Sequence, residues 1–387
     1  MTILPLSDIT VLDLSHILSG PFATMTLGDF GARVIKVESP AGDSTRKWGP
    51  PFLGDDAAYF YAINRNKESV QIDLKDDKGR EFFEKLVLQA DVVVENFRPG
   101  TLSKLQFDFS RLRELNPEII LCSISGFGQT GPKHMQTGFD QIAQGMSGLM
   151  SVTGNSNGEP MRAGFSVGDL SAAMWALVGI LIAVRHRDKT GEGQWVDVSL
   201  VDSLISFQTF QAQNYFATGQ NPQPCGSAHP NLVPYQAFRC RDGFINIAVG
   251  NDNLWRSFCL ALDLPLADDP KFRTNPDRVD NKNELLALIT ARLAVETVNK
   301  ALDIFNQFGV PAGPIYRLSE VFQDEQVMAR NMVFSFPSDT REIIQQISTP
   351  IKLSETPATP RTAPPKLGEH TEKVWRELYA LSKFDRN

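Results

Sequence analysis

Short apolar runs alternate with amphipathic stretches through the first half of the chain. Strands are predicted, from β-branched runs, at residues 9–14, 33–37, 70–74, 91–95, 118–123 and 195–200. Helices are predicted, from helical spacing of apolar positions, at residues 22–30, 78–89 and 202–216. Strands that alternate with helices favour a parallel sheet covered on both faces, so the pattern predicts an α/β fold.

The pattern changes after residue 220. Four prolines fall between Asn221 and Tyr235, which is typical of an extended linker. A strand at 243–249 and three helices at 254–262, 282–293 and 295–308 are predicted to follow. The predicted organisation is a large domain over 1–220 completed by 325–387, a linker over 221–235, and a smaller α+β domain over 236–324.

Composition excludes several classes of protein. The 387 residues carry a net charge of −7, which argues against a nucleic-acid partner or a membrane partner, because both usually require a basic face. The four cysteines have no CxxC spacing, so neither a zinc site nor a disulfide framework is expected. No signal peptide is evident, and a cytoplasmic location is expected.

The stretch RAGFSVGDLSAAMW places one carboxylate, Asp169, at the start of a run that stays uncharged from Leu170 to Val184. This run is shorter than the roughly 20 residues that span a bilayer, so it is predicted to be a buried helix that ends at Gly191. Two interpretations of Asp169 follow from the residues alone. It is either a helix cap, for which aspartate is favoured, or a partly desolvated carboxylate held for chemistry.

The first strand–turn–helix could suggest a nucleotide site, but its turn reads SHILSGP and contains no GxGxxG. A dinucleotide pyrophosphate needs those glycines for close approach of the backbone, so a nicotinamide oxidoreductase is not favoured. The start of the helix after Pro21 and the neighbouring His16 remain available for an anion.

Ten blocks of sequence, in order, resemble the class III CoA-transferase family, which includes formyl-CoA:oxalate and carnitine CoA-transferases. They include DLSHILSGPFATMTLGDFGARVIKVE, DVVVENFRPGTLSKL, the VGDLSAA of the stretch above, and KTGEGQWVDVSLVDSL. The resemblance implies a Rossmann-like large domain and a smaller α+β domain. It also implies a homodimer in which the two subunits are threaded through each other like linked rings.

The resemblance assigns Asp169 as the nucleophile of a CoA transfer from an acyl-CoA thioester to a small organic (di)carboxylic acid. The implied intermediates are an aspartyl anhydride and an aspartyl-CoA thioester. CoA enters as a substrate, and neither a permanently bound cofactor nor a metal is expected. The sequence identifies neither the donor nor the acceptor acid.

Five further residues match CoA-contacting positions of the family: His16, Lys75, Asn96, Phe97 and Lys104. The alternatives are a turn residue for His16 and a solvated charge for Lys75. Lys104 replaces an arginine of the oxalate enzymes, which keeps the charge but loses the planar fork.

Phe139 and Asp140 match positions near the family's active site. A 2-methylacyl-CoA racemase is the first alternative function, but its histidine falls where this chain has Phe139, which cannot carry a proton.

Asp140 stands where formyl-CoA:oxalate transferases have a glutamate, and its alternative is a surface helix cap. The glycine-rich loop of those enzymes is absent, which leaves open how an anhydride is shielded from water. A non-catalytic CoA-binding protein is the second alternative.

Overall fold

The computed structural model describes residues 3–336 and 343–384. The chain divides into two compact units, which are described separately. Unit 1 contains residues 1–149, 162–217 and 328–387, and unit 2 contains residues 150–161 and 218–327.

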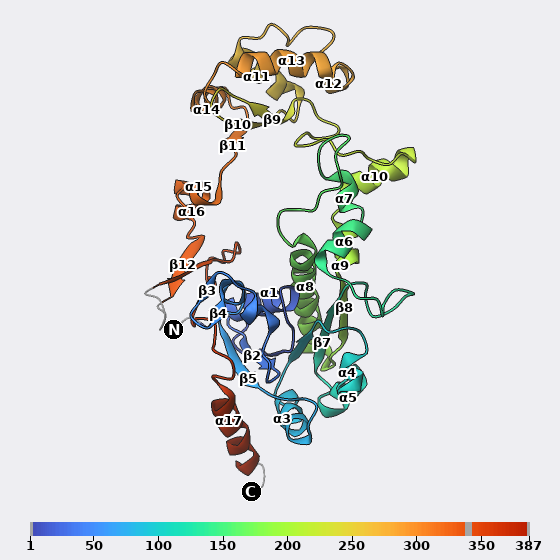
Figure 1. The fold of residues 1–387 in the computed structure, drawn as a ribbon, viewed down its shortest axis with the longest axis vertical. Helices are drawn as coiled ribbons and strands as arrows, with labels where there is room; N and C mark the ends of the chain where they lie inside the picture. The colour runs from blue at the N-terminus through green and yellow to red at the C-terminus, as the bar shows by residue number, and fades with distance from the viewer. Residues whose placement is uncertain (1–2, 337–342, 385–387) are drawn as a thin grey trace. The chain divides into compact units, whose positions relative to one another are not determined.

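A six-stranded parallel sheet forms the centre of unit 1 (Figure 1). Its strands, in order across the sheet, are β5 (Lys67–Gln71), β2 (Arg33–Glu38), β1 (Thr10–Asp13), β6 (Val92–Glu95), β7 (Ile120–Ser125) and β8 (Trp195–Ser199). Parallel strands need crossover connections, and helices supply most of them here. The mixed α/β class expected from the sequence is therefore confirmed.

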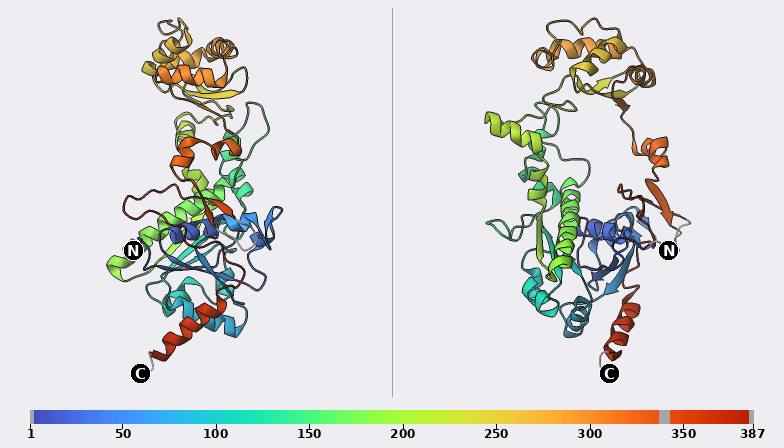
Figure 2. Two further views of the ribbon diagram at one scale, coloured as in Figure 1. Left: turned by 90° about the vertical axis from the view of Figure 1, so that its left-hand side faces the viewer. Right: turned by 180° about the vertical axis from the view of Figure 1, so that it is seen from behind.

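Alternate side chains of each strand enter two different cores. Val92 and Val94 face α1 (Ser19–Asp29) and α8 (Val167–Thr190), whereas Val93 between them faces the opposite side of the sheet. That second core contains α3 (Asp77–Val87), α5 (Phe109–Leu115) and the C-terminal helix α17 (Thr371–Phe384), which lies beside α3 in both views of Figure 2. Both faces of the sheet are thus covered.

Helix α8 begins with Asp169 in its first turn and ends at Gly191, whose φ of 72° is the left-handed conformation that terminates helices. Its small residues Ala172, Ala173 and Ala176 are fully buried. Apolar residues on its other side are exposed, with Ile182 at 63%. The prediction of a buried helix is therefore confirmed for one face of α8 only. Among the described residues, α8 is also the one helix long and apolar enough to cross a membrane, a test that core helices pass as well.

Two elements of unit 1 differ from those that the sequence pattern predicts. The strand expected at 70–74 is β5, which begins three residues earlier because Lys67 and Ser69 point into the protein and are paired with buried carboxylates. The helix expected over 202–216 is broken into α9 (Leu200–Ser206) and α10 (Thr209–Thr218), with Thr209 at a positive φ of 33°.

Unit 2 is built on an antiparallel sheet of β9 (Tyr235–Arg239), β10 (Phe244–Ala248) and β11 (Ala312–Pro314). Its core contains stacked aromatic rings, among them Phe258 and Phe305 at 5.5 Å between centroids. Helices α11 (Asp252–Leu262), α13 (Lys282–Leu293) and α14 (Val298–Gln307) supply most of that core.

Two segments belong to unit 2 although the sequence places them elsewhere. Residues 150–161 were expected in the large domain, but Gly154 and Ser156 hydrogen-bond to residues 224–226. The segment 221–235 was expected to be a linker, but Val233 is buried in the core of unit 2. The carbonyl of Val233 also accepts a hydrogen bond from the fully buried Arg278 at 2.7 Å. Both segments are therefore packed parts of this unit.

Candidate active site

The carboxyl ends of β1 and β6 form the natural ligand site of this sheet. Strand order runs from β1 to β2 and β5 in one direction, and from β6 to β7 and β8 in the other. The loops after β1 and β6 therefore diverge, and open α/β sheets bind ligands in the crevice that this leaves. His16 follows β1, while Asn96 and Phe97 follow β6.

Asn96 joins these two loops. Its side-chain oxygen accepts a hydrogen bond from the backbone N–H of His16 at 2.8 Å, and its side-chain amide donates to the backbone carbonyl of His16 at 2.7 Å. The rings of His16 and Phe97 lie 5.7 Å apart. The structure thus brings together three of the five residues that the sequence predicts to contact CoA.

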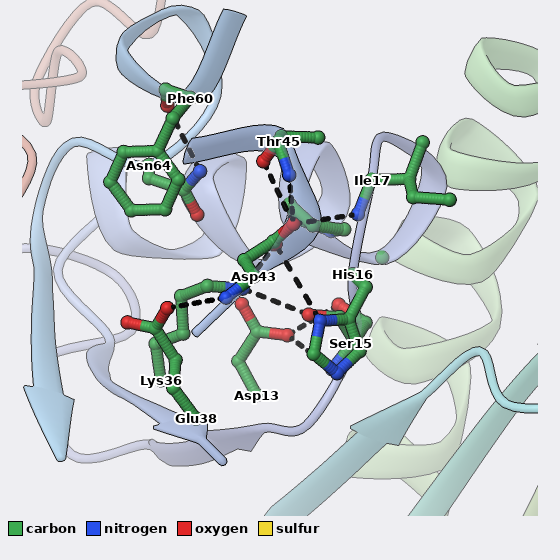
Figure 3. A network of polar contacts seen from close by, with 12 residues as sticks. Asp13, Ser15, His16, Ile17, Lys36, Glu38, Asp43, Thr45, Phe60 and Asn64 are labelled. Carbon is green, nitrogen blue, oxygen red and sulfur yellow. Dashed lines mark hydrogen bonds and ion pairs between the residues drawn. The ribbon is translucent and has the colours of Figure 1, made fainter. Parts of the chain in front are cut away.

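The turn after β1 is strained. Ile17 has a φ of 68°, a conformation that a β-branched residue rarely adopts. The surroundings hold it there, since the Lys36 ammonium donates to the carbonyl of Ser15 at 2.8 Å and Asp43 accepts from the Ile17 N–H at 3.5 Å (Figure 3). Strain that is maintained in this way is common at functional sites.

Buried charges lie beside this turn (Figure 3). Lys36 pairs with Asp43 at 3.0 Å, and Lys67 pairs with Asp13 at 2.8 Å, with all four side chains inaccessible to solvent. Burial alone would raise the pKa of Asp13, but the ammonium groups of Lys67 and Lys36 outweigh it and hold that pKa well below its usual range. The acidic residues in this cluster therefore carry charge and are paired.

The His16 imidazole is neutral at neutral pH. Burial lowers its pKa, and the Lys36 ammonium lowers it further, against the opposing effect of Asp43. Nδ1 of His16 lies 3.9 Å from the Asp43 carboxylate, which is close enough to orient the ring. A neutral imidazole offers one donor and one acceptor to a ligand.

Asp169 lies in the first turn of α8 and does not cap it, because the residue at the cap position is Ser166. Its half-buried carboxylate makes no hydrogen bond or ion pair with any residue in the described ranges. Burial, with the charge of Asp140 in addition, raises the pKa of Asp169 to about 7. When ionised, a carboxylate in this state is a stronger base and nucleophile than an ordinary aspartate.

Asp140 lies in the first turn of α6 (Asp140–Met146) and is buried, with an exposure of 9%. Its Oδ1 accepts a hydrogen bond from the N–H of Gly168 at 2.8 Å. Its carboxylate therefore binds the start of α8 and does not cap its own helix at the surface. A Cβ on Gly168 would lie 2.9 Å from this oxygen, so a larger residue there would displace the Asp140 carboxylate.

Phe139 precedes α6 and is 60% exposed. Its loop folds tightly, because a Cβ on Gly126 would lie 2.7 Å from the Cα of Gly138. Arg98, just after β6, donates to the carbonyl of Met135 in the same loop at 2.7 Å. The Phe139 ring offers no proton donor or acceptor.

Lys75 and Lys104 are exposed. Lys75 follows β5, and Lys104 ends the short helix α4 (Thr101–Lys104) that comes after β6. Both therefore leave the sheet at its carboxyl edge, where the other predicted residues lie. Within the described part of the chain, neither lysine forms a hydrogen bond with His16, Asn96 or Phe97.

Tyr59 of α2 (Ala58–Ala62) was not indicated by the sequence. Its pKa is raised to about 12, first by burial and then by the charges of Asp169 and Asp140. The phenol therefore stays protonated and lies within the field of the candidate nucleophile. Its ring packs edge-on against Trp48 at 5.4 Å. Nothing in the local sequence marks Tyr59, because the fold alone brings it within the field of Asp169.

Among the described residues, no group of three His, Cys, Asp or Glu side chains lies close enough together to hold a metal ion. The polar groups at the carboxyl edge of the sheet are instead a neutral imidazole, amides, exposed ammonium groups and one unpaired carboxylate. This set can bind an anionic organic ligand and attack an acyl carbon.

Comparison with known proteins identifies relatives over nearly the whole chain. Residues 6–371 match the sequence profile described as CoA-transferase family III. Succinyl-CoA:glutarate CoA-transferase of Mus musculus is 41% identical over 379 residues, which cover 97% of this chain and 86% of that protein. Succinate–glutarate CoA-transferase of Agrobacterium fabrum is 42% identical over 387 residues, covering 98% of this chain and 97% of that protein.

A solved structure is similar in fold as well as in sequence. The crystal structure of a CAIB/BAIF family protein from Brucella suis has a TM-score of 0.87 and 40% sequence identity to this chain. The match covers 98% of this chain and 100% of that one.

Proposed function

Because this chain belongs to CoA-transferase family III, an enzyme family that moves CoA between acids, we propose that Asp169 is its nucleophile. The observation that carries the proposal is the half-buried carboxylate at the start of α8, which has no donor of its own and a pKa raised to about 7. Perturbed carboxylates of this kind are typical of covalent catalysis.

The first half of the proposed reaction loads CoA onto the enzyme. A carboxylate oxygen of Asp169 attacks the thioester carbonyl carbon, the C–S bond breaks, and CoA leaves as the thiolate. The thiolate then attacks the aspartyl carbonyl of the mixed anhydride. The donor acid is released as its carboxylate, and an aspartyl-CoA thioester remains.

The second half reverses these steps with a new acid. The acceptor carboxylate attacks the aspartyl thioester and expels the thiolate, and the thiolate then attacks the acceptor's acyl carbon. This forms the new acyl-CoA and returns Asp169 as a carboxylate. No net proton is taken up or released. Each tetrahedral intermediate carries an oxyanion, and the Tyr59 hydroxyl, which stays protonated and whose pKa the charge of Asp169 helps to raise, is the donor that we propose for it.

CoA is proposed to bind at the carboxyl edge of the sheet. His16, Asn96 and Phe97 form one connected surface there, and Lys75 and Lys104 supply positive charge on a chain whose net charge is −7. For the acids, we propose small dicarboxylates, since the relatives' names specify succinyl-CoA and glutarate. No observation favours the racemase alternative, because Phe139 offers no group that could carry a proton.

Trapping the intermediate tests the proposal. The wild-type enzyme incubated with succinyl-CoA and quenched with hydroxylamine should yield a hydroxamate on the peptide that contains Asp169. Asp169→Asn retains the shape but replaces the nucleophile with an amide, and turnover should fall by several orders of magnitude. Near-normal turnover in a folded Asp169→Asn protein, or a hydroxamate on a different residue, would remove the assignment.

A homodimer is the second part of the proposal. The exposed apolar residues of α8 form a continuous helical face: Met174, Trp175, Val178, Leu181 and Ile182. Exposed apolar patches of this extent usually mark a protein interface. We propose that a second copy of the chain covers this face, in the linked-ring arrangement that the sequence resemblance implies.

A further inference from the structure

Gln144 is a buried amide on α6, with no exposed surface, and it makes two hydrogen bonds in opposite directions. Its Nε2 donates to Oδ2 of Asp140 at 2.7 Å. Its Oε1 accepts from the backbone N–H of Ala163 at 2.8 Å. The amide has one orientation only, because a flipped amide would place its oxygen against a carboxylate and its NH₂ against an N–H.

These two bonds continue into α8. Asp140 uses Oδ2 for Gln144 and Oδ1 for the N–H of Gly168, at 2.8 Å. Ala163 and Gly168 stand at the two ends of the segment that leads into Asp169. Gln144 and Asp140 therefore hold both ends of that segment from a single helix, α6.

The arrangement also determines which charges surround Asp169. The first N–H groups of a helix normally stabilise a nearby anion. Here the Gly168 N–H is taken by Asp140 and is not available to the Asp169 carboxylate. Two titratable groups interact electrostatically with Asp169: Asp140 from α6 and Tyr59 from α2. Tyr59 is neutral, because its pKa is raised to about 12. The charge that matters is thus that of Asp140.

We propose that Gln144 is a positioning residue of the transfer reaction, which locks the Asp140 carboxylate onto the start of α8 and keeps its negative charge beside Asp169. This inference rests on the proposed role of Asp169 as nucleophile. A carboxylate that is denied the Gly168 N–H and faces a like charge is more basic, and a more basic carboxylate attacks a thioester carbonyl more strongly. Gln144 touches no reacting atom and acts through Asp140.

The pH profile of kcat/KM tests the inference, because its acid limb reports the ionisation of the essential base of the free enzyme. Gln144→Met keeps the length of the side chain and removes both hydrogen bonds. Asp140 then loses its partner on α6 and turns away from Gly168, which removes its charge from beside Asp169. The acid limb should move to lower pH by about one unit, and kcat at high pH should fall about tenfold or more.

Three further variants distinguish this role from a structural one. Asp140→Asn should move the acid limb in the same direction, and the double variant Gln144→Met/Asp140→Asn should coincide with Asp140→Asn alone. Ser147→Ala is the matched control, since Ser147 caps the C-terminus of α6 and its hydroxyl donates to the backbone carbonyl of Gln144 at 3.2 Å without a hydrogen bond to Asp140. Its acid limb should stay at the wild-type pH.

The inference would be overturned if the acid limb of Gln144→Met fell at the same pH as the acid limbs of wild type and Ser147→Ala. Gln144 would then be a packing residue. If Gln144→Met does not fold, Gln144→Asn withdraws the amide by one methylene, and the same shift is expected. Failure of the proposed function has a different signature. In that case wild type transfers no CoA, or Asp169→Asn retains turnover, and the positioning role fails together with the nucleophile.

Discussion

At the residue scale, the site places similar carboxylates in contrasting surroundings. Asp13 and Asp43 are buried next to ammonium groups and stay ionised, whereas Asp169 is half-buried with no cationic partner among the described residues. Burial next to Asp140 therefore raises the pKa of Asp169 to about 7. The same type of side chain thus serves as a fixed charge in one place and as a candidate nucleophile in another.

The raised pKa of Asp169 has a consequence for stability. An unfolded aspartate ionises near its usual 3.8, whereas the folded one holds its proton up to about 7. The folded state therefore loses stability relative to the unfolded state as pH rises between these values, and the loss persists above them. Asp169→Asn does not titrate, so its Tm relative to wild type should increase by a few degrees between pH 4 and pH 8.

Calorimetric scans at several pH values measure this difference. Asp8→Asn is the control, because Asp8 is an exposed carboxylate in the same unit, ahead of β1. Its Tm relative to wild type should stay constant over the same range. A pH-independent difference for Asp169→Asn would contradict the raised pKa and weaken the case for a desolvated nucleophile.

Phe139 provides a second test at this scale. Racemisation of a 2-methylacyl-CoA needs one group to remove the α-proton and another to return it from the opposite face. With phenylalanine at 139, the second group is missing, so no exchange of the α-proton into deuterated water is expected by NMR. Asp169→Asn gives the background rate. Rapid exchange that depends on Asp169 would place racemisation above CoA transfer.

At the scale of elements, the turn between β1 and α1 is the part of the site that depends most on one side chain. Asn96 holds this turn through both of its hydrogen bonds to the backbone of His16, next to the strained Ile17. Asn96→Ala removes both bonds. The turn should relax, and KM for the acyl-CoA should rise about tenfold or more while kcat changes less, because the nucleophile is untouched.

Asn116→Ala is the matched control for this variant. Asn116 is also partly buried, and its side chain donates to two backbone carbonyls, those of Val87 and Ala90, at the other end of the sheet. It should lower Tm by a similar amount and leave KM for the acyl-CoA unchanged. Equal KM values in the two variants would mean that the turn does not contact CoA.

How well the elements could be predicted depends on where their polar residues lie. The start and end of α8 were readable, because a run without charges follows Asp169 and the left-handed Gly191 stops the helix a few residues beyond that run. The start of β5 was misplaced, because Lys67 reads as a surface residue although its ammonium is buried against Asp13. A buried charge can be predicted from a sequence only if its partner is known. The partner of Lys67 is Asp13, which lies 54 residues away.

The same limit applies to the site. Asp169 and the loop residues His16 and Asn96 stand next to recognisable elements, so motifs could locate them. Tyr59 and Gln144 could not be found in this way. Gln144 resembles any polar residue on a short helix, and its importance follows from two hydrogen bonds that the fold creates. Packing between segments distant in sequence supplies the information that local patterns lack.

At the scale of the whole molecule, the exposed apolar face of α8 needs a cover. Five large side chains on this face are between 39% and 63% exposed in the single chain, Met174, Trp175, Val178, Leu181 and Ile182. Burying such side chains contributes roughly 25 cal/mol for each Å² removed from water, which favours association strongly over solvation. A second copy of the chain is the proposed cover.

If the two subunits are threaded through each other as proposed, they cannot separate unless the chains open. Size-exclusion chromatography with light scattering should then give a dimer mass at every concentration of a dilution series, down to nanomolar protein.

Ile182→Lys places a charge on the exposed apolar face of α8. This variant should lower the yield of folded protein and should not release folded monomers, because the interface forms during folding. Lys189→Glu, at the exposed end of the same helix, is the control and should remain dimeric with a normal yield. A monomer with intact far-UV circular dichroism, from wild type at low concentration or from Ile182→Lys, would contradict the threaded arrangement.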